Sequence, residues 1–366
     1  ESEWRALKTM HQKGLLYKGH KIVPYCPRCG TALSSHEVAQ GYKLVKENSV
    51  VARFKVKGAE NRYILAWTTT PWTLPSNVAL CMNPDEPYVE IEAEGESYIL
   101  AKALVGNFFE EYKVVAEKKG SEWEGLEYEP LFKETTAEVK RISPASAQVK
   151  SHYVVCDGYV TMGDGTGIVH IAPAFGEDDY KVGKRYGLPV VQLVNERGCF
   201  DERFPALDGL FAKKADKIII EMLEKEGKLF KVVPFEHDYP HCWRCDTPLL
   251  YYARSSWFIE VTKVKEDIKA ANRSVNWMPD TIKEGRMGNF LENVIDWGLS
   301  RDRYWGTPLP VWVCPDCGEI EVIGSKAELK EKCGLKPDAE IELHRPYLDN
   351  LTCTCPKCGG KMKRTP

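Results

Sequence analysis

Two short cysteine motifs, YCPRCG at residues 25–30 and HCWRCD at residues 241–246, decide how this chain of 366 residues is organised. Each motif separates two cysteines by two residues in a context that favours a turn, so both sulfurs of a pair can reach one metal ion. The two pairs, Cys26/Cys29 and Cys242/Cys245, lie 213 positions apart. If they share one ion, the chain between them leaves and returns to the same place. The motifs therefore predict a zinc-pinned stem that carries an inserted domain of roughly 190 residues.

Two more pairs, Cys314/Cys317 in VCPDCG and Cys355/Cys358 in TCPKCGG, lie 38 positions apart and predict a small zinc ribbon. Four thiolates around each ion leave no open coordination position, so both Zn²⁺ ions are expected to be structural. Cys353 is an alternative ligand to Cys355. Disulfides and redox chemistry are the competing interpretations. The odd total of 13 cysteines and the lack of a secretion signal oppose disulfides, and the lack of a thioredoxin-like context opposes redox chemistry.

The composition is that of a globular protein with two or three domains. A mass of 41.5 kDa and 43% hydrophobic residues suffice for a sizeable core. The chain has no run of eighteen uncharged apolar residues, and its charged amino terminus is unlike a signal peptide, so we expect a cytoplasmic protein without a membrane segment. The 50 basic residues nearly balance the 53 acidic ones, which opposes a chain held to nucleic acid by a basic tail.

Between the stem motifs the dominant hydrophobic period is two, which predicts short strands in a β-barrel-like or strongly curved sheet. Helices are predicted where a period of 3.6 residues appears, so the expected fold is mixed α/β. The predicted strands cover residues 43–56, 62–70, 88–93, 97–101, 152–160 and 167–171, and the predicted helices cover residues 4–17, 178–186, 212–226 and 326–332. The predicted segments are 1–45 (N-terminal helix and first zinc knuckle), 46–234 (inserted domain), 235–310 (second knuckle and return to a core) and 311–366 (zinc ribbon).

The segment WTTTPWTLPSN at residues 67–77 combines a threonine run at the end of a predicted strand with a loop that contains two prolines. Threonine is a good strand former, so a plain sheet edge is one interpretation. The prolines oppose a central strand and favour a loop in which hydroxyl groups and free backbone N–H groups form a polar cup. The segment is therefore a candidate binding site.

A second unusual segment, GDGTGIVHIAPAFGEDDY at residues 163–180, predicts a glycine-rich turn, a buried strand, a loop and a helix that begins with acidic residues. The glycines come before the strand, which is the wrong order for a dinucleotide-binding turn. Two simpler interpretations stay open. Asp178 and Asp179 can merely complement the dipole of the helix, and His170 can be an ordinary core histidine.

The chain resembles the isoleucyl-tRNA synthetases, a class I family, over essentially its whole length. WTTTPWTLPSNVAL and GTGIVHIAPAFGEDDY match the two motifs of the family's inserted editing domain (CP1), and LSRDRYWGTPLPVW matches the return of the chain to the catalytic core. Within the second motif, the sequence AFGEDDY is closer to that of the archaeal or eukaryotic branch of the family. The ATP-binding motifs of the family are missing, so we expect a fragment that does not activate isoleucine. ATP and Mg²⁺ are then cofactors only of the full-length parent.

The resemblance implies proofreading, which is hydrolysis of the ester that links valine to the 3′ end of tRNA(Ile), with valyl-adenylate as a further possible substrate. In this scheme Asp179 anchors the α-ammonium group of valine, and Asp178 is the less favoured neighbour. His170 lines the amino-acid pocket, where its bulk excludes isoleucine; a role as general base is less favoured.

The threonine motif takes the remaining roles that the resemblance implies. Thr68, Thr69 and Thr70 supply donors around the substrate and the attacking water. Trp72 frames the pocket or stacks on the terminal adenine, and Asn77 shapes the adenosine side. The implied partners are the tRNA(Ile) 3′ end that carries valine and the remainder of the synthetase core, with the protein a monomer that binds no membrane.

Two other functions stay open at this point. A zinc-ribbon module that binds tRNA without chemistry is opposed by the near-neutral charge and by the lack of a long basic stripe. An editing domain of a valine or leucine synthetase is opposed by TTTPWT, because those relatives carry Arg-Pro after the threonines. The basic residues near the carboxyl end are expected on a solvated face: Lys357, Lys361, Lys363 and Arg364.

Overall fold

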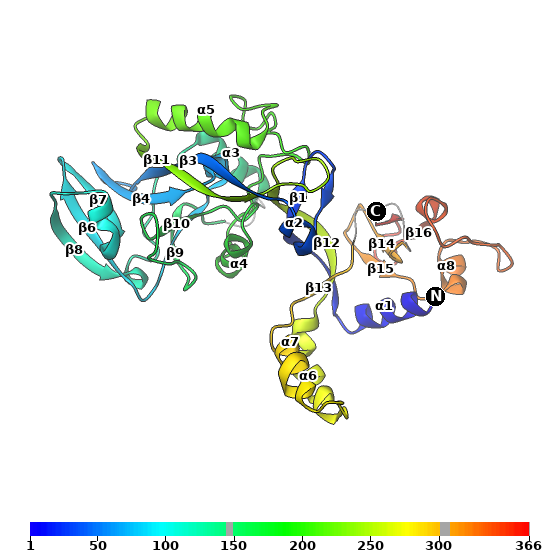
Figure 1. The fold of residues 1–366 in the computed structure, drawn as a ribbon. Helices are drawn as coiled ribbons and strands as arrows, with labels where there is room; N and C mark the ends of the chain where they lie inside the picture. The colour runs from blue at the N-terminus through cyan, green and yellow to red at the C-terminus, as the bar shows by residue number, and fades with distance from the viewer. Residues whose placement is uncertain (144–148, 301–307, 366) are drawn as a thin grey trace. The chain divides into compact units, whose positions relative to one another are not determined.

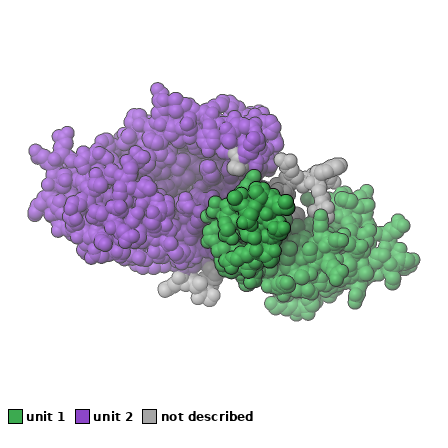
Figure 2. All heavy atoms as spheres, turned by 60° about the horizontal axis from the view of Figure 1, so that its bottom comes forward, with its two compact units in different colours: residues 1–20, 255–366 green, residues 21–254 purple. Residues whose placement is uncertain are grey.

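The computed structural model describes residues 1–143, 149–300 and 308–365, and the chain divides into two compact units (Figure 1, Figure 2). Unit 1 consists of residues 1–20 and 255–366, and unit 2 consists of residues 21–254. The chain enters unit 2 along β1 (Leu16–Cys26) and leaves it along β12 (Leu250–Ile259). Unit 2 is thus an insertion in the sequence of unit 1. The finer division into four segments stays a prediction.

Unit 2 is built on a nine-stranded mixed sheet. Seven strands follow the order β8 (Lys113–Lys119), β6 (Pro87–Ala93), β7 (Glu96–Ala101), β4 (Arg62–Thr68), β10 (Ile168–Ile171), β5 (Ala79–Met82) and β9 (Tyr153–Cys156). β3 (Tyr42–Lys55) also pairs with β4, and its other partner is β11 (Leu229–Pro240). The sheet curls into a half-barrel (Figure 1), which confirms the predicted mixed α/β fold with a strongly curved sheet.

β3 and β11 form the stem of unit 2. They pair antiparallel from Tyr42 and Pro240, next to the cysteine motifs, up to Ala52 and Leu229 in the sheet. The chain therefore leaves the motifs along one strand and returns along its neighbour. Gly41 is required at the base of the stem, because a Cβ atom there would lie 1.9 Å from the carbonyl oxygen of His241.

Helices pack their apolar faces on the core of unit 2. In α5 (Ala212–Lys225) the buried residues recur every three or four positions, as expected for one helical face: Ala212, Ala215, Ile219 and Leu223. The 3₁₀ helix η1 (Pro71–Ser76) is buried along its whole length and contacts α5. The remaining elements of unit 2 are β2 (Thr31–Ala32), α2 (Ser35–Ala39), η2 (Lys102–Asn107), η3 (Gly120–Glu122), α3 (Lys133–Ile142) and α4 (Glu177–Tyr186).

Unit 1 contains helices and a small four-stranded ribbon of order β15 (Ile320–Val322), β14 (Val311–Val313), β17 (Lys361–Arg364) and β16 (Thr352–Thr354). Trp4 of α1 (Ser2–Gln12) packs edge-on against Trp312 of the ribbon, with 6.4 Å between the ring centroids. The other elements of unit 1 are η4 (Val261–Val264), α6 (Lys265–Ser274), η5 (Lys283–Met287), α7 (Gly288–Glu292), β13 (Trp297–Gly298), α8 (Lys326–Lys332) and η6 (Tyr347–Asn350).

Several predicted elements differ from the structure. The helix predicted over residues 4–17 ends at Gln12, because Gly14 adopts the left-handed conformation and β1 begins at Leu16. The strand predicted over residues 152–160 covers only β9, and the strand predicted to Thr70 stops at Thr68. β11 was not among the predicted strands. It contains Pro234, which the sheet tolerates in a strand whose described partner is β3 alone.

Arg364 does not lie on a solvated face, contrary to the prediction. Its side chain is only 3% exposed, and its Nε donates to Oδ1 of Asp349 at 2.9 Å. A buried guanidinium needs such a partner, because an unpaired charge is costly to remove from water. Lys361 and Lys363 are exposed, as predicted. Residues 301–307 of the predicted core-return motif lie outside the described residues, and no helix in the described chain is long and apolar enough to span a membrane.

Candidate functional site

The threonine segment lies where β4 ends and η1 begins. β4 and β10 run parallel and pair Trp67 with Val169, so the next residues along these strands, Thr68 and His170, lie on the same side of the sheet. The ladder stops soon afterwards, because Pro71 has no N–H to donate and its fixed φ suits the first turn of a helix. The two motifs quoted from the sequence are therefore neighbours in space.

Three threonine hydroxyls form a hydrogen-bonded chain that ends on His170. Oγ1 of Thr68 accepts the backbone N–H of Thr70 at 3.1 Å and lies 3.4 Å from Oγ1 of Thr70. Oγ1 of Thr70 lies 3.4 Å from Oγ1 of Thr73, which is 2.9 Å from Nε2 of His170. The hydroxyl of Thr73 donates to the backbone oxygen of Thr70 at 2.8 Å, so it accepts a hydrogen bond from the imidazole. This network assigns the proton of His170 to Nε2.

His170 is neutral at physiological pH. It is 6% exposed, and its burial lowers the pKa of the imidazole to about 4, because the charged form loses its hydration. With the proton on Nε2, the lone pair of Nδ1 faces the protein interior, where it has no hydrogen-bond partner among the described residues. Nδ1 of His170 is therefore a buried acceptor without a partner in the described chain.

Asp179 lies in the first turn of α4 and folds back over the start of the helix. Its Oδ2 accepts the backbone N–H of Ala172, in the loop after β10, at 2.9 Å. Gly176 precedes α4, and a Cβ atom on it would lie 2.6 Å from the carboxyl carbon of Asp179, so only glycine leaves room for this conformation. Burial raises the pKa of Asp179 to about 7, and the bond from Ala172 opposes that rise.

Asp178 differs from its neighbour in exposure and in partner. Its side chain is 56% exposed and forms an ion pair of 3.0 Å with Lys181, one turn along α4. Such a surface pair is worth little energy and holds no group inside the protein. Of the two acidic residues, only Asp179 contacts the loop that follows His170.

Trp72 and Asn77 are buried parts of the wall behind the threonines. The ring of Trp72 is 3% exposed and packs edge-on against Phe175, with 4.8 Å between centroids. This burial favours the framing role over stacking on an adenine, which needs an accessible ring face. Asn77 donates to the backbone oxygen of Ala79 and accepts from the hydroxyl of Tyr128, at 2.8 and 2.7 Å. Both ends of its amide are thus used inside the protein.

Two further residues belong to this arrangement and were not predicted. Thr73 follows Thr70 by three positions, the period at which side chains of a 3₁₀ helix align, so that spacing was the available signal. Asp216 of α5 accepts a hydrogen bond from the backbone N–H of Trp72 at 2.7 Å, although the two residues are 144 positions apart. No local sequence pattern predicts this contact. Burial raises the pKa of Asp216 to about 7. Thr69, which was predicted, is half-buried.

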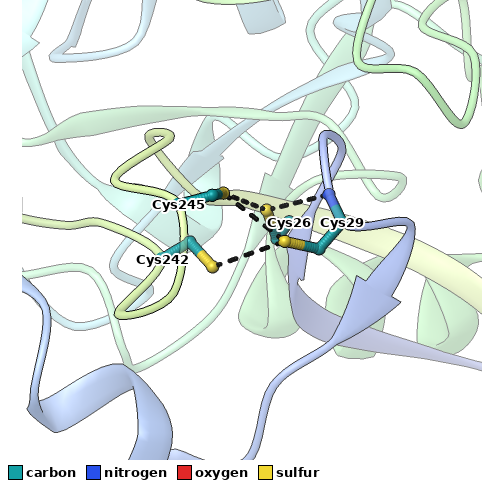
Figure 3. Close-up of side chains that lie close together, drawn as sticks. All are labelled: Cys26, Cys29, Cys242 and Cys245. Carbon is teal, nitrogen blue, oxygen red and sulfur yellow. Dashed lines mark hydrogen bonds between the residues drawn. The ribbon is translucent and has the colours of Figure 1, made fainter.

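The two predicted cysteine groups each bring four sulfurs together. Within each group the ligand atoms lie within 4.8 Å of one another. In the stem (Figure 3), Sγ of Cys29 lies 3.9 Å from Cys242 and 3.4 Å from Cys245, and Cys26 lies 3.4 Å from Cys245. Sulfurs bound tetrahedrally to zinc at about 2.3 Å lie about 3.8 Å apart, so these spacings fit the ion.

The ribbon group has the same geometry. Cys314 lies 3.5 Å from Cys358, and Cys317 lies 3.6 Å from Cys355. Cys353 does not take the place of Cys355, because its sulfur faces Cys333 at 2.8 Å, outside the group of four. The pairing of the four motifs, stem with stem and ribbon with ribbon, agrees with the sequence prediction. Each group can hold one metal ion.

Known proteins match the chain over its whole length. The family model for tRNA synthetases class I (I, L, M and V) matches residues 1–365. Isoleucine–tRNA ligases are 58% identical in Clostridium acetobutylicum over 365 residues and 48% identical in Bacillus thuringiensis over 367 residues, and each match covers 100% of this chain. The chain spans about a third (34%) of the length of these relatives. The prediction of an archaeal or eukaryotic branch is not supported, because these relatives are bacterial.

Solved structures give a weaker likeness. GlLeuRS-CP1 has a TM-score of 0.37 and 14% identity, and the editing domain of the P. falciparum cytosolic leucyl-tRNA synthetase has a TM-score of 0.37 and 10% identity. Each covers 51% of this chain, and 99% of that structure is matched. A TM-score this low carries no conclusion about mechanism. The family match does not depend on it: this chain belongs to the class I tRNA synthetases of the isoleucine, leucine, methionine and valine group.

Proposed function

We propose that this chain is the proofreading part of an isoleucyl-tRNA synthetase, and that it hydrolyses the ester of Val-tRNA(Ile). The observation that supports the proposal most strongly is the meeting of the two motifs. The hydroxyl chain of Thr68, Thr70 and Thr73 ends on His170, and Asp179 is bonded to the loop directly after that histidine. Donors and a neutral imidazole thus meet from β4, η1 and β10, and the carboxylate on α4 is bonded to the loop that follows β10.

The need for a second site follows from the chemistry of the two amino acids. Isoleucine and valine differ by one methylene, and it is well established that a hydrophobic pocket separates them by only about 1 to 3 kcal/mol. A hydrolytic site that admits valine and excludes isoleucine by size raises the accuracy further. Such a site must hold the α-ammonium group and the ester, which both amino acids share, and must be too small for the isoleucine side chain.

Asp179 is suited to hold the α-ammonium group of the substrate. When ionised, its carboxylate supplies a negative charge beside the positive end of the α4 dipole. A cation that arrives next to this carboxylate favours its ionised form and lowers its raised pKa. Asp178 is the weaker candidate, because Lys181 already pairs with it.

His170 is proposed to set the size limit of the pocket. Its pKa of about 4 makes the imidazole a poor base at neutral pH, because a catalytic base works best when its pKa lies near the working pH. The bulk of its imidazole remains, and this suits a limit on the size of the substrate side chain. The steric role is therefore favoured over the role of general base.

The threonines are proposed to orient water and to stabilise the charge that develops on the ester carbonyl. An aminoacyl ester is already activated, so fixed donors and correct positioning can supply much of the rate. Thr68 and Thr70 belong to the hydrogen-bonded chain, and Thr69 adjoins them. Trp72 and Asn77 are proposed to act indirectly, by supporting this wall.

Zinc is proposed for both cysteine groups, where four thiolates would give closed structural sites. Bound zinc would cross-link the two chain segments of the stem and the two knuckles of the ribbon. The tRNA(Ile) 3′ end and the remainder of the synthetase are the proposed partners, and the protein is proposed to act as a monomer. ATP and Mg²⁺ are assigned to the synthetic reaction of the whole enzyme.

The test is the release of amino acid from purified Val-tRNA(Ile) and Ile-tRNA(Ile) by the folded, zinc-loaded protein. The proposal expects the valine ester to be hydrolysed at least about 10-fold faster than the isoleucine ester, from the energy of one methylene. Threonine and norvaline esters serve as comparison substrates, because valine and leucine synthetases would favour them. Failure to cleave any ester would reject the hydrolytic function and favour a module that only binds tRNA.

A further inference from the structure

The first turn of η1 has an unusual capping arrangement. The first N–H groups of a helix have no partner inside the helix, and a threonine at the preceding position commonly accepts one of them. Thr70 occupies that position, but within the described residues its side chain makes no hydrogen bond to an N–H of the first turn. Its Oγ1 lies instead 3.4 Å from each of the hydroxyls of Thr68 and Thr73. The cap must therefore come from elsewhere.

Asp216 supplies the missing acceptor from a different helix. Pro71 has no N–H, so Trp72 carries the first N–H of η1, and this group donates to Oδ1 of Asp216 at 2.7 Å. Its other oxygen lies 3.8 Å from Nζ of Lys213, whose side chain is 8% exposed. Lys213 is held in turn by Glu47, at 2.6 Å. The carboxylate is thus fixed from two sides.

We infer that Asp216 is a positioning residue for the hydroxyl chain: it caps η1 from α5 and so leaves the Thr70 side chain free to join Thr68, Thr73 and His170. The two roles of Thr70 compete, because the side-chain position that places its Oγ1 next to Thr68 and Thr73 makes no bond to the N–H of Trp72. Without Asp216, the unpaired N–H draws the Thr70 hydroxyl into the usual capping position, and the chain to His170 is broken. The consequence for catalysis rests on the proposed function.

Four variants separate capping from other effects. Asp216→Ala removes the acceptor, and Asp216→Asn keeps an oxygen that can accept the N–H of Trp72 but removes the charge. Asp216→Glu keeps the charge and displaces the oxygens by one methylene, so it tests the cap if the alanine variant fails to fold. Lys217→Ala is the matched control, because Lys217 is the next residue on α5 and its side chain is 86% exposed.

The cap is measured first without any substrate. In Asp216→Ala, and to a smaller extent in Asp216→Glu, the amide hydrogen of Trp72 should exchange with solvent about 10-fold faster, as expected for the loss of one hydrogen bond. The imidazole nitrogen resonances of His170 should shift in the same variants. Asp216→Asn and Lys217→Ala should match the unaltered protein. Unchanged exchange and unchanged His170 resonances in the folded alanine or glutamate variant would overturn the inference.

Hydrolysis then tests the catalytic consequence. For Val-tRNA(Ile), kcat should fall by about 10- to 100-fold in Asp216→Ala with KM nearly unchanged, and Asp216→Asn should restore it. A fall in the asparagine variant as large as in the alanine variant would show that charge, not capping, matters, and would overturn the inference. If the unaltered protein hydrolyses no ester, the proposed function fails, and the exchange and resonance measurements still decide whether Asp216 positions the hydroxyls.

Discussion

Nε2 of His170 and Oγ1 of Thr73 lie 2.9 Å apart, and this hydrogen bond joins two motifs that are 97 positions apart in the sequence. The hydroxyl of Thr73 donates its hydrogen bond to the backbone oxygen of Thr70, so it accepts from Nε2, and this fixes which nitrogen of the imidazole carries hydrogen. A histidine on β10 and a 3₁₀ helix after β4 therefore hold each other in place. The proposed water-orienting donors and the proposed size limit belong to one network.

Thr73 should be needed for its hydroxyl and not for its shape. Thr73→Val keeps the volume but leaves Nε2 of His170 as a buried donor without an acceptor, which should lower kcat for Val-tRNA(Ile) hydrolysis by about 10-fold. Thr73→Ser keeps the hydroxyl and should remain within a few-fold of the unaltered protein. The comparison is made by steady-state deacylation, with thermal unfolding of each variant as the folding control. Equal rates in the valine and serine variants would contradict the network.

His170 should control which amino acid is removed. In His170→Ala the pocket gains the volume of an imidazole, so Ile-tRNA(Ile) should become a substrate and the preference for valine should fall by at least about 10-fold. A general base would behave differently: hydrolysis of the valine ester would collapse, and isoleucine would stay excluded. Deacylation of the two esters measured side by side distinguishes the steric role from the basic role.

The pKa of Asp179, raised by burial to about 7, should appear in the pH dependence of hydrolysis. An α-ammonium group is attracted only by the ionised carboxylate, so kcat/KM for Val-tRNA(Ile) should fall as the pH is lowered below about 7. The measurement covers pH 5.5 to 7.5, with uncatalysed hydrolysis subtracted. A flat profile across this range in the unaltered protein would show that Asp179 does not anchor the substrate.

The same shift predicts how stability depends on pH. The carboxyl of Asp179 ionises near pH 4 in the unfolded chain and near pH 7 in the folded chain, so the folded state binds more protons between these values. The free energy of unfolding should therefore decrease as pH rises from 4 to 7, relative to Asp179→Asn, which does not titrate. Urea unfolding of both proteins at pH 5 and pH 7.5 tests this. A difference between the two proteins that stays constant with pH would contradict it.

The metal content of two variants should show whether Cys355 or Cys353 is the fourth ligand of the ribbon group. Cys355→Ser should lose one of two bound zinc ions, because Cys355 belongs to the group of four. Cys353→Ser should keep both ions, because its sulfur faces Cys333. Metal analysis of the purified variants measures this, with Cys245→Ser as the corresponding change in the stem. Loss of an ion in Cys353→Ser and not in Cys355→Ser would reverse the assignment.

The stem and the metal groups could be predicted from sequence because short spacings encode them. Two residues between cysteines fix a local turn, and the 213 positions between Cys29 and Cys242 already imply a chain that returns to its start. The polar helix over residues 326–332 was predicted with its observed bounds. Such signals are local, and folding of the rest of the chain does not alter them.

The residues that complete the site are set by long-range contacts, which a single sequence does not reveal. Asp216 looks like a surface acid of a helix, and only the packing of α5 on η1 brings it to the N–H of Trp72. Trp72 and Asn77 were expected to face the substrate, yet their polar or aromatic groups are used inside the protein. Asp178 and Asp179 are adjacent in sequence, and the back-folded side chain over Gly176 distinguishes them.

The most direct test of the account compares the unaltered protein with Asp179→Asn in the deacylation of Val-tRNA(Ile) at pH 7.5. Asparagine keeps an acceptor for the N–H of Ala172 and removes only the charge, so the fold should persist. We expect selective release of valine by the unaltered protein and a loss of about 100-fold in the variant, the typical effect of removing one partner of a buried charge pair. Equal hydrolysis by a folded Asp179→Asn protein would contradict the ammonium anchor at the centre of the account.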